Sequence, residues 1–255
     1  MTGFLASVTN VDEARIALEV GADIIDLKNP VLGALGALPI PVIEEIVHFV
    51  DGRRPVSATV GDLPMQPSVL CDAVETTAAT GVDMVKIGFF GKERHAECAQ
   101  ILASVAQRGK KIIAVMFADQ RPDITLLPLL ADAGFHGVML DTANKSAGGL
   151  RDWLSESDLQ NFVSTALTHG LLTGLAGSLQ ESDIFPLASL SADYLGFRGA
   201  LCSDNERTFT LDLERIIAIR KVVAQMQQPI LNGDREVAIP SCFAYSSFEL
   251  STTGV

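Results

Sequence analysis

Residues 112–141, IIAVMFADQRPDITLLPLLADAGFHGVMLD, contain the pattern on which the fold prediction rests. An apolar run at Ile112–Phe117 precedes an amphipathic stretch at Thr125–Ala133, and Gly134 separates that stretch from a second apolar run at Gly137–Asp141. A short strand, a helix that ends at a glycine and another short strand are typical of a βαβ unit. In such a unit the two strands are parallel and the helix covers one face of the sheet.

The same succession fills most of the chain. The predicted strands are Phe4–Val8, Ile24–Lys28, Val56–Val60, Met84–Gly88, Ile112–Phe117, Gly137–Asp141, Leu172–Ala176 and Tyr194–Arg198. The predicted helices are Val11–Val20, Pro41–Val50, Ser68–Thr80, Ala96–Arg108, Thr125–Ala133, Glu156–His169, Glu181–Leu190 and Leu211–Met226. Eight βα units predict a single-domain α/β protein with a (β/α)₈ TIM-barrel fold over residues 1–226. An open, doubly wound sheet is the alternative, and the unbroken count of eight units speaks against it.

Residues 227–255 follow the last predicted helix and show no clear periodicity. They contain Pro229 and Pro240, and also the aromatic residues Phe243, Tyr245 and Phe248. Two alternatives therefore stay open for this tail. It packs on the barrel or on a neighbouring subunit of a homo-oligomer, or it is disordered.

The composition of the 255-residue chain narrows the classes of partner. Its formal net charge is −12, and none of its Lys/Arg runs exceeds two residues. An acidic protein repels phosphate backbones, so neither nucleic acid nor an anionic membrane is an expected partner. The chain lacks an apolar stretch of membrane-spanning length and a basic, apolar leader at its start, which favours a cytoplasmic location.

The sequence gives no sign of a metal or organic cofactor. The four cysteines, Cys71, Cys98, Cys202 and Cys242, are scattered without a C-x-x-C pair, so we expect reduced thiols and no structural zinc site. Nucleotide-binding glycine motifs, G-x-S-x-G and H-E-x-x-H are also missing. We therefore predict that the protein works without a metal or cofactor.

Charged residues follow several predicted strands, at the end where TIM barrels carry their active sites. Asp26 and Lys28 lie two residues apart and share one face of their strand, and by the same parity Lys86 and Asp141 point into the barrel mouth. Three of only seven lysines, Lys28, Lys86 and Lys145, lie at or just after these strand ends. Each lysine alone is compatible with a salt bridge at the barrel rim, but the three together indicate a catalytic site.

Clustered ammonium groups in a partly dry cavity disfavour one another's protonation, so one of these lysines can be an amine near neutral pH. An amine attacks a carbonyl to form a Schiff base, and Asp26 and Asp141 are then placed to move protons at the adjacent carbons. A charge partner for a lysine is the simpler alternative for Asp141.

The ends of the seventh and eighth strands predict a phosphate site. Gly177-Ser178 and Gly199-Ala200 are small residues with backbone N–H groups, at the place where TIM barrels often hold phosphate. Arg198 adds a cation between them. We predict that these five residues bind the phosphate of a substrate.

Seven segments carry a resemblance to a known family. They are Leu5-Ala-Ser-Val8, Gly21-Ala-Asp-Ile-Ile-Asp-Leu-Lys-Asn-Pro30, Pro55-Val-Ser-Ala-Thr-Val-Gly-Asp62, Val85-Lys-Ile-Gly88, Met139-Leu-Asp-Thr-Ala-Asn-Lys145, Leu175-Ala-Gly-Ser-Leu179 and Phe197-Arg-Gly-Ala200. Over roughly residues 3–224 the chain resembles the (5-formylfuran-3-yl)methyl phosphate synthase family, also called 4-(hydroxymethyl)-2-furancarboxaldehyde-phosphate synthase. The Asp-x-Lys-Asn-Pro and Leu-Asp-Thr-x-x-Lys elements are its specific motifs.

The resemblance implies a (β/α)₈ lyase that condenses two molecules of glyceraldehyde 3-phosphate, a triose phosphate, into a phosphorylated furan aldehyde with loss of phosphate and water. In the family this furan begins methanofuran or methylofuran. By resemblance Lys28 is the Schiff-base lysine, and Asp26, Lys86, Asp141 and Lys145 are further active-site residues. Archaeal members carry an additional lysine near the fifth strand, where this chain has Arg121, which keeps the charge but cannot act as an amine.

Two alternative functions stay open for this set of residues. A simple Schiff-base aldolase acting on sugar phosphates needs the same lysine and phosphate site but eliminates no phosphate. A non-catalytic barrel that binds a metabolite predicts stabilisation by ligand without product, and the complete set of lysines and aspartates speaks against it.

Overall fold

The computed structural model describes residues 1–226, and the tail predicted over residues 227–255 lies outside the described residues. The strands are β1 (Gly3–Val8), β2 (Ile24–Leu27), β3 (Val56–Thr59), β4 (Met84–Phe89), β5 (Lys111–Phe117), β6 (Gly137–Asp141), β7 (Leu172–Leu175) and β8 (Tyr194–Phe197). Each strand pairs in parallel with the next and β8 pairs with β1, so the barrel is closed. The predicted (β/α)₈ fold is confirmed, and the open sheet is excluded.

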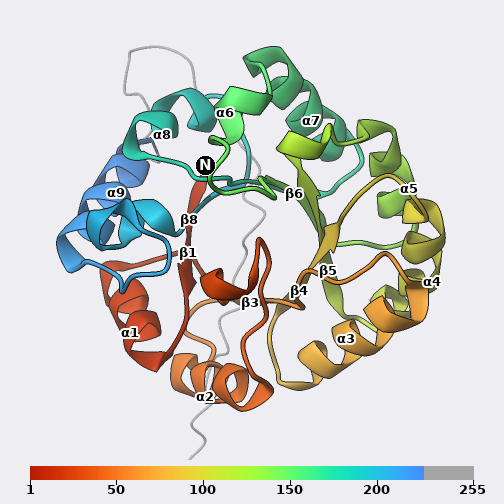
Figure 1. Cartoon of the computed structure of the whole chain (residues 1–255), viewed down its shortest axis with the longest axis horizontal. Helices are drawn as coiled ribbons and strands as arrows, with labels where there is room; N and C mark the ends of the chain where they lie inside the picture. Colours follow the sequence, from red (N-terminus) through yellow and green to blue (C-terminus); the bar gives the residue numbers. More distant parts are fainter. Residues whose placement is uncertain (227–255) are drawn as a thin grey trace, which may run out of the picture.

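Helices form a ring outside the strands (Figure 1). They are α1 (Val11–Val20), α2 (Ile40–Val50), α3 (Pro67–Ala79), α4 (His95–Gln107), α5 (Leu127–Asp132), α6 (Leu150–Trp153), α7 (Glu156–Thr168), α8 (Glu181–Ala188) and α9 (Leu213–Met226). The sequence did not predict α6. The helix predicted over Thr125–Ala133 is shorter than expected, because the 3₁₀ turn Ile124–Leu126 precedes α5 and Pro128 lacks the amide that an earlier helical turn would need.

Local chemistry explains where these elements begin and end. The Asn10 side chain accepts a hydrogen bond of 2.9 Å from the backbone N–H of Glu13 and so caps α1. The helix ends at Gly21, whose φ of 86° is the left-handed conformation that glycine adopts without steric cost. Comparable caps divide the chain into short βα units.

Apolar side chains form one layer outside the strands and one inside the barrel. The outer layer lies between the strands and the helices, and the inner layer fills the barrel with Leu5, Met84, Ile113, Val115, Phe117, Met139, Ala176 and Tyr194. Ala34 and Leu35 belong to the inner cluster although they come from the segment after β2, which Figure 1 shows within the ring. The Phe90 ring stacks on Phe117 with 4.3 Å between centroids. The two stacked rings lie at the carboxyl ends of β4 and β5.

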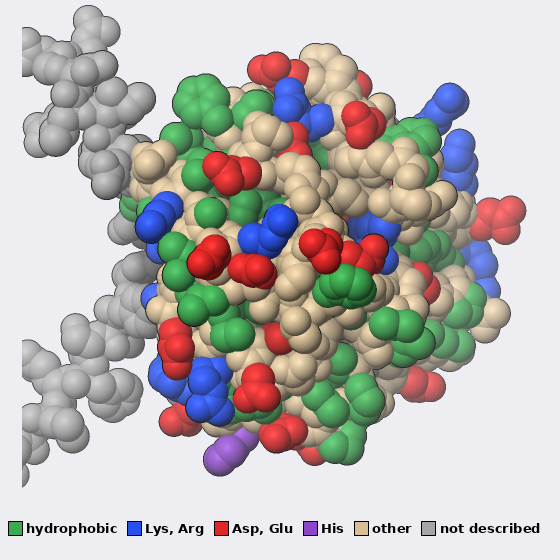
Figure 2. Space-filling model, turned by 60° about the vertical axis from the view of Figure 1, so that its left-hand side comes forward, with side chains coloured by type: hydrophobic (Ala, Val, Ile, Leu, Met, Phe, Trp, Pro, Cys, Tyr) green, Lys and Arg blue, Asp and Glu red, His purple; other side chains and the backbone are tan. Residues whose placement is uncertain are grey.

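The outer surface carries mixed charge. On the face over α8, α9 and α1, red and blue side chains alternate, and the described residues of that face form no continuous basic patch (Figure 2). Within residues 1–226, none of the helices is long and apolar enough to cross a membrane.

Candidate active site

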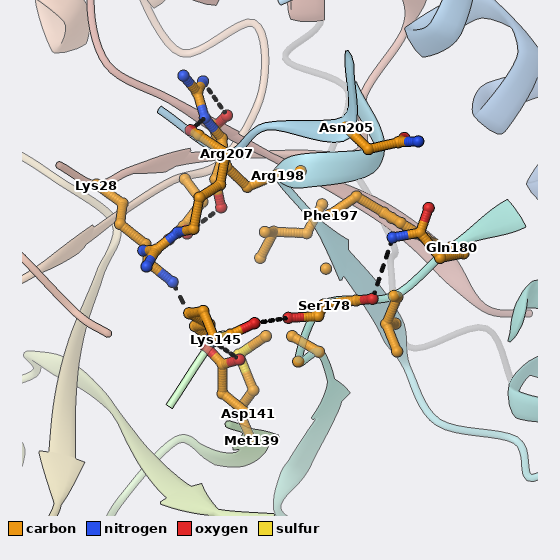
Figure 3. Close-up of a pocket in the computed structure, with 18 of the residues that line it drawn as sticks. Lys28, Met139, Asp141, Lys145, Ser178, Gln180, Phe197, Arg198, Asn205 and Arg207 are labelled. Carbon is orange, nitrogen blue, oxygen red and sulfur yellow. Dashed lines mark hydrogen bonds and ion pairs between the residues drawn. The ribbon is translucent and has the colours of Figure 1, made fainter. Parts of the chain in front are cut away.

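A cavity of about 370 Å³ opens at the carboxyl ends of the strands. Nine of the ten predicted site residues line it, namely Asp26, Lys28, Lys86, Asp141, Lys145, Gly177, Ser178, Arg198 and Gly199. The tenth, Ala200, is buried in the outer apolar layer and does not line the cavity. Figure 3 shows side chains from the two halves of the barrel converging there, Lys28 on one side and Asp141 and Lys145 on the other.

The first half of the site is a buried ion pair on β2 and β4. Lys86 Nζ lies 2.9 Å from Asp26 Oδ1, and the pair is almost inaccessible to solvent. The strand register places Ser7, Asp26 and Ser57 in one row, so that the two serine hydroxyls donate to the Asp26 carboxylate at 2.8 Å and 2.6 Å. Both oxygens of the buried carboxylate are therefore hydrogen-bonded, as burial of a charge requires.

The second half of the site joins two lysines to one carboxylate. Lys28 Nζ lies 3.3 Å from Asp141 Oδ2, and Lys145 forms an ion pair with Asp141 Oδ1. The backbone N–H of Thr142 also donates to Asp141 Oδ1 at 2.8 Å. Asp141 thus holds the ammonium groups of two different strand ends at one point of the cavity.

Burial and neighbouring charges shift the pKa values of the two aspartates in this site. Burial raises the pKa of Asp26, but Lys86, Lys28 and the Ser57 hydroxyl outweigh it and lower the pKa overall. The pKa of Asp141 is likewise lowered, because Lys145 and Lys28 outweigh its burial. Both carboxylates are therefore ionised at neutral pH.

The pKa values of two lysines are lowered as well, here by burial. Burial lowers the pKa of Lys28, with Asp141 opposing this effect and Lys86 adding to it. Burial also lowers the pKa of Lys145 to about 8, again against the attraction of Asp141. A lysine with a pKa of about 8 exchanges its proton in the range in which enzymes use acid–base catalysis.

Several contributing residues were missed from the sequence. Ser7, Ser57 and Thr142 lie within segments that carry the family resemblance, but only the strand register and the hydrogen bonds show that they contact the aspartates. Asp119 accepts hydrogen bonds of 2.8 Å from the amides of residues 143 and 144 and so fixes the segment that carries Lys145.

Arg121 does not join the site. It lines a separate cavity beside α4, together with Lys92 and His95.

Arg198 requires a correction. Its five N–H groups all donate to the protein: two to the Glu13 carboxylate at 2.6 Å and 3.2 Å, and three to the carbonyls of residues 7, 207 and 209. A guanidinium that is saturated in this way has no donor left for a substrate. The prediction that Arg198 binds phosphate is therefore replaced by a structural role, in which Arg198 holds the segment after β8 against α1.

This role predicts a stability effect at its partner. Replacing Glu13 by Ala leaves the Arg198 charge buried without its carboxylate, and loss of one partner of a buried ion pair costs about 3–5 kcal/mol. We expect the free energy of unfolding in urea to fall by this amount. Glu19→Ala, at an exposed position of the same helix, is the matched control. Equal midpoints for the two variants would contradict the role.

The turn after β7 keeps the geometry of an anion site. Gly177 and Ser178 have φ values of 112° and 51°, and a Cβ at Gly177 would lie 3.0 Å from Thr142 Cγ2, so only glycine fits there. Among residues 1–226, no acceptor is hydrogen-bonded to the amides of Ser178 or Gly199. Both residues line the cavity, and phosphate binding by their N–H groups stays a prediction.

The walls of the cavity carry more positive than negative side chains. The cations are Lys28, Lys86, Lys145, Arg198 and Arg207, and the carboxylates are Asp26, Asp141 and Glu206. Even with Arg198 neutralised by Glu13, the excess favours an anionic ligand. Within the described residues, no group of three or more His, Cys, Asp or Glu side chains is arranged to hold a metal ion.

Fold and cavity together define a TIM barrel with a buried cluster of lysines and aspartates at the carboxyl ends of its strands. The sequence model of one protein family, described as 4-HFC-P synthase, matches residues 4–220. The chain belongs to this family.

Curated relatives agree with this assignment. A relative from Methanopyrus kandleri, named (5-formylfuran-3-yl)methyl phosphate synthase, is 39% identical over 214 residues, which are 80% of this chain and 90% of the relative. A relative of the same name from Methanosarcina acetivorans is 34% identical over 88% of this chain and 98% of its own length. A protein from Methylorubrum extorquens, provisionally given the same name, is 44% identical over 83% of this chain and 87% of its own length.

Solved structures confirm the fold alone. The 3-hexulose-6-phosphate synthase from Salmonella typhimurium superposes with a TM-score of 0.65 and 16% identity, over 88% of this chain and all of that one. Phosphoribosyl anthranilate isomerase from Thermus thermophilus gives a TM-score of 0.63 with 14% identity, over 89% of this chain and all of that one.

Proposed function

We propose that the protein is a (5-formylfuran-3-yl)methyl phosphate synthase that condenses two molecules of glyceraldehyde 3-phosphate through a lysine Schiff base. The observation that carries this proposal is the buried Lys28–Asp141–Lys145 cluster in a cavity with excess positive charge. The names of the curated relatives support the product, and the chemistry of the cluster supports the route to it.

In the first step Lys28 forms the Schiff base. Its amine attacks the aldehyde carbon of one triose phosphate, and loss of water leaves an iminium ion. The iminium acidifies the adjacent carbon, and a base removes that proton to give an enamine. Asp26 and Asp141 are ionised carboxylates in the cavity and Lys145 is an amine above pH 8, so the site contains several groups that can accept the proton.

The enamine has two productive fates. Its electron pair breaks the C3–O bond and expels the phosphate from the third carbon of the triose, re-forming the iminium, or it forms a carbon–carbon bond from C2 to the aldehyde of the second triose phosphate. Ring closure by a hydroxyl then releases the lysine. The mass balance from two triose phosphates to the furan phosphate requires the loss of one phosphate and two water molecules, and neither oxidant nor reductant is consumed.

The direct test uses purified protein with glyceraldehyde 3-phosphate as the only substrate. We expect a new ultraviolet absorbance from the conjugated furan aldehyde, its mass in the product, and one inorganic phosphate released for each furan. EDTA-treated protein is the control for the predicted independence from metal, and we expect it to retain full turnover.

The two other functions give different results in this assay. A simple Schiff-base aldolase forms a sugar bisphosphate and releases no phosphate. A metabolite-binding barrel shows a rise in melting temperature with the triose phosphate and forms no product. Either result overturns the proposal.

A further inference from the structure

The segment between β8 and α9 forms a wall of the cavity. It contains the 3₁₀ turns Gly199–Leu201 and Ser203–Asn205, and it ends at the start of α9. One guanidinium fixes its course: Arg198 donates 2.9 Å and 2.7 Å hydrogen bonds to the carbonyls of residues 207 and 209. Glu13 accepts a further hydrogen bond from the amide of Leu211 at 3.3 Å. The backbone at Arg207 and just after it is therefore anchored.

Arg207 itself points into the cavity. Figure 3 shows its side chain extending from this segment toward Lys28. Its positive charge lowers the pKa of both Lys28 and Lys145, in addition to the larger effect of their burial. The side chain is half-buried, and burial lowers the pKa of the guanidinium itself against the attraction of Asp141.

The guanidinium of Arg207 is largely unused. Within residues 1–226, its one hydrogen bond runs from Nη2 to the carbonyl oxygen of Gly33, at 2.8 Å. The other four N–H groups of this half-buried cation have no protein acceptor within residues 1–226, and Arg207 lines the cavity. The other cations differ, because Lys28, Lys86 and Lys145 are paired with aspartates and Arg198 is saturated.

The acceptor at Gly33 is rigidly placed. The Asp62 carboxylate accepts hydrogen bonds from the amides of Ala34 and Leu35 at 2.8 Å and 2.6 Å, which fixes the segment after β2. A Cβ at Gly33 would lie 2.1 Å from Asp62 Oδ2, and φ is 116°, so the position requires glycine. A neutral acceptor therefore holds Arg207 beside the lysine cluster. Asp141, Asp62 and Glu206 attract its charge, but within residues 1–226 none of them forms a hydrogen bond or ion pair with it.

We propose that Arg207 binds a phosphate group of the substrate and thereby selects phosphorylated over non-phosphorylated trioses. A planar guanidinium with free N–H groups matches the oxygens of phosphate, and the positive surroundings strengthen this contact. The inference deepens the proposed function, on which the identity of the substrate rests. Anion binding by Arg207 can be measured independently of turnover.

The test compares Arg207→Met with the wild-type protein and with Arg108→Met, an exposed arginine paired with Glu75 on the outer helices. Calorimetric titration with inorganic phosphate should show a dissociation constant roughly 10- to 100-fold higher in Arg207→Met, because a charge-assisted contact is lost. Arg108→Met should bind as the wild type does. Arg207→Lys keeps the charge without the planar fork, and we expect an intermediate value.

The second measurement is borohydride trapping of the imine with glyceraldehyde 3-phosphate and with non-phosphorylated glyceraldehyde. We expect Arg207→Met to lose most of the preference for the phosphorylated triose and to trap glyceraldehyde as the wild type does. Unchanged phosphate binding and an unchanged preference would overturn the assignment of Arg207, whatever the product of the reaction. Phosphate binding that depends on Arg207 in a protein that forms no furan would instead uphold this assignment and overturn the proposed function.

Discussion

Lys28→Arg is expected to fold normally and to lose at least about a thousandfold in turnover, because the substitution removes the group that forms the imine. The guanidinium keeps the positive charge and the partnership with Asp141, so the fold has little reason to change. It stays protonated at any working pH and cannot attack a carbonyl.

Trapping with borohydride locates the nucleophile directly. With glyceraldehyde 3-phosphate, peptide mapping of the wild-type protein should show a three-carbon or condensed adduct on Lys28. Lys92→Arg, at an exposed lysine outside this cavity, is the matched control and should keep full activity and the adduct. An adduct on Lys86 or Lys145, or substantial turnover in Lys28→Arg, would show that a different lysine is the nucleophile.

The sequence predicted the barrel and the lysine–aspartate cluster for the same physical reason. Alternation along a strand places Asp26 and Lys28 on the inner face, and parallel strands bring their carboxyl ends to one rim. The observed cavity contains both residues together with Lys86, Asp141 and Lys145. For Asp26, Lys28, Lys86 and Asp141 the prediction needed only the strand boundaries, which the apolar runs and the glycines mark. Lys145 lies beyond β6 and was predicted from its place just after the strand end and from the family resemblance.

The phosphate-binding arginine could not be predicted in the same way. Arg198 directly follows β8, and its position in the sequence does not show that Glu13, 185 residues earlier, would occupy its guanidinium. Arg207 lies in an irregular segment whose course is set by hydrogen bonds to backbone carbonyls rather than by a periodic pattern. Strand parity therefore identifies residues on the strands, whereas side chains on the loops depend on long-range contacts that a single sequence does not display.

Asp141→Asn is the substitution with the second large expected effect. Asp141 joins Lys28 and Lys145, and the amide that replaces it offers one neutral oxygen where two ionic contacts were made. We expect turnover to fall by about 10²- to 10⁴-fold, the range for loss of a group that positions or moves protons. Asp72→Asn, an exposed aspartate on α3, is the matched control and should leave turnover unchanged.

The pH dependence separates this loss from simple misfolding. Burial lowers the pKa of Lys145 to about 8 while Asp141 raises it, so removal of the carboxylate lowers this pKa further. Asp141 raises the pKa of Lys28 in the same way. The Asp141→Asn substitution should therefore lower the pKa of both lysines. Because Lys145 accepts a proton only as the free amine, kcat/KM of the wild type should rise with pH through about 8, the pKa of Lys145. In Asp141→Asn, the rising limb of the residual kcat/KM should lie at a lower pH than in the wild type. A rising limb at the wild-type position in a folded Asp141→Asn variant would show that neither lysine limits the reaction by its protonation.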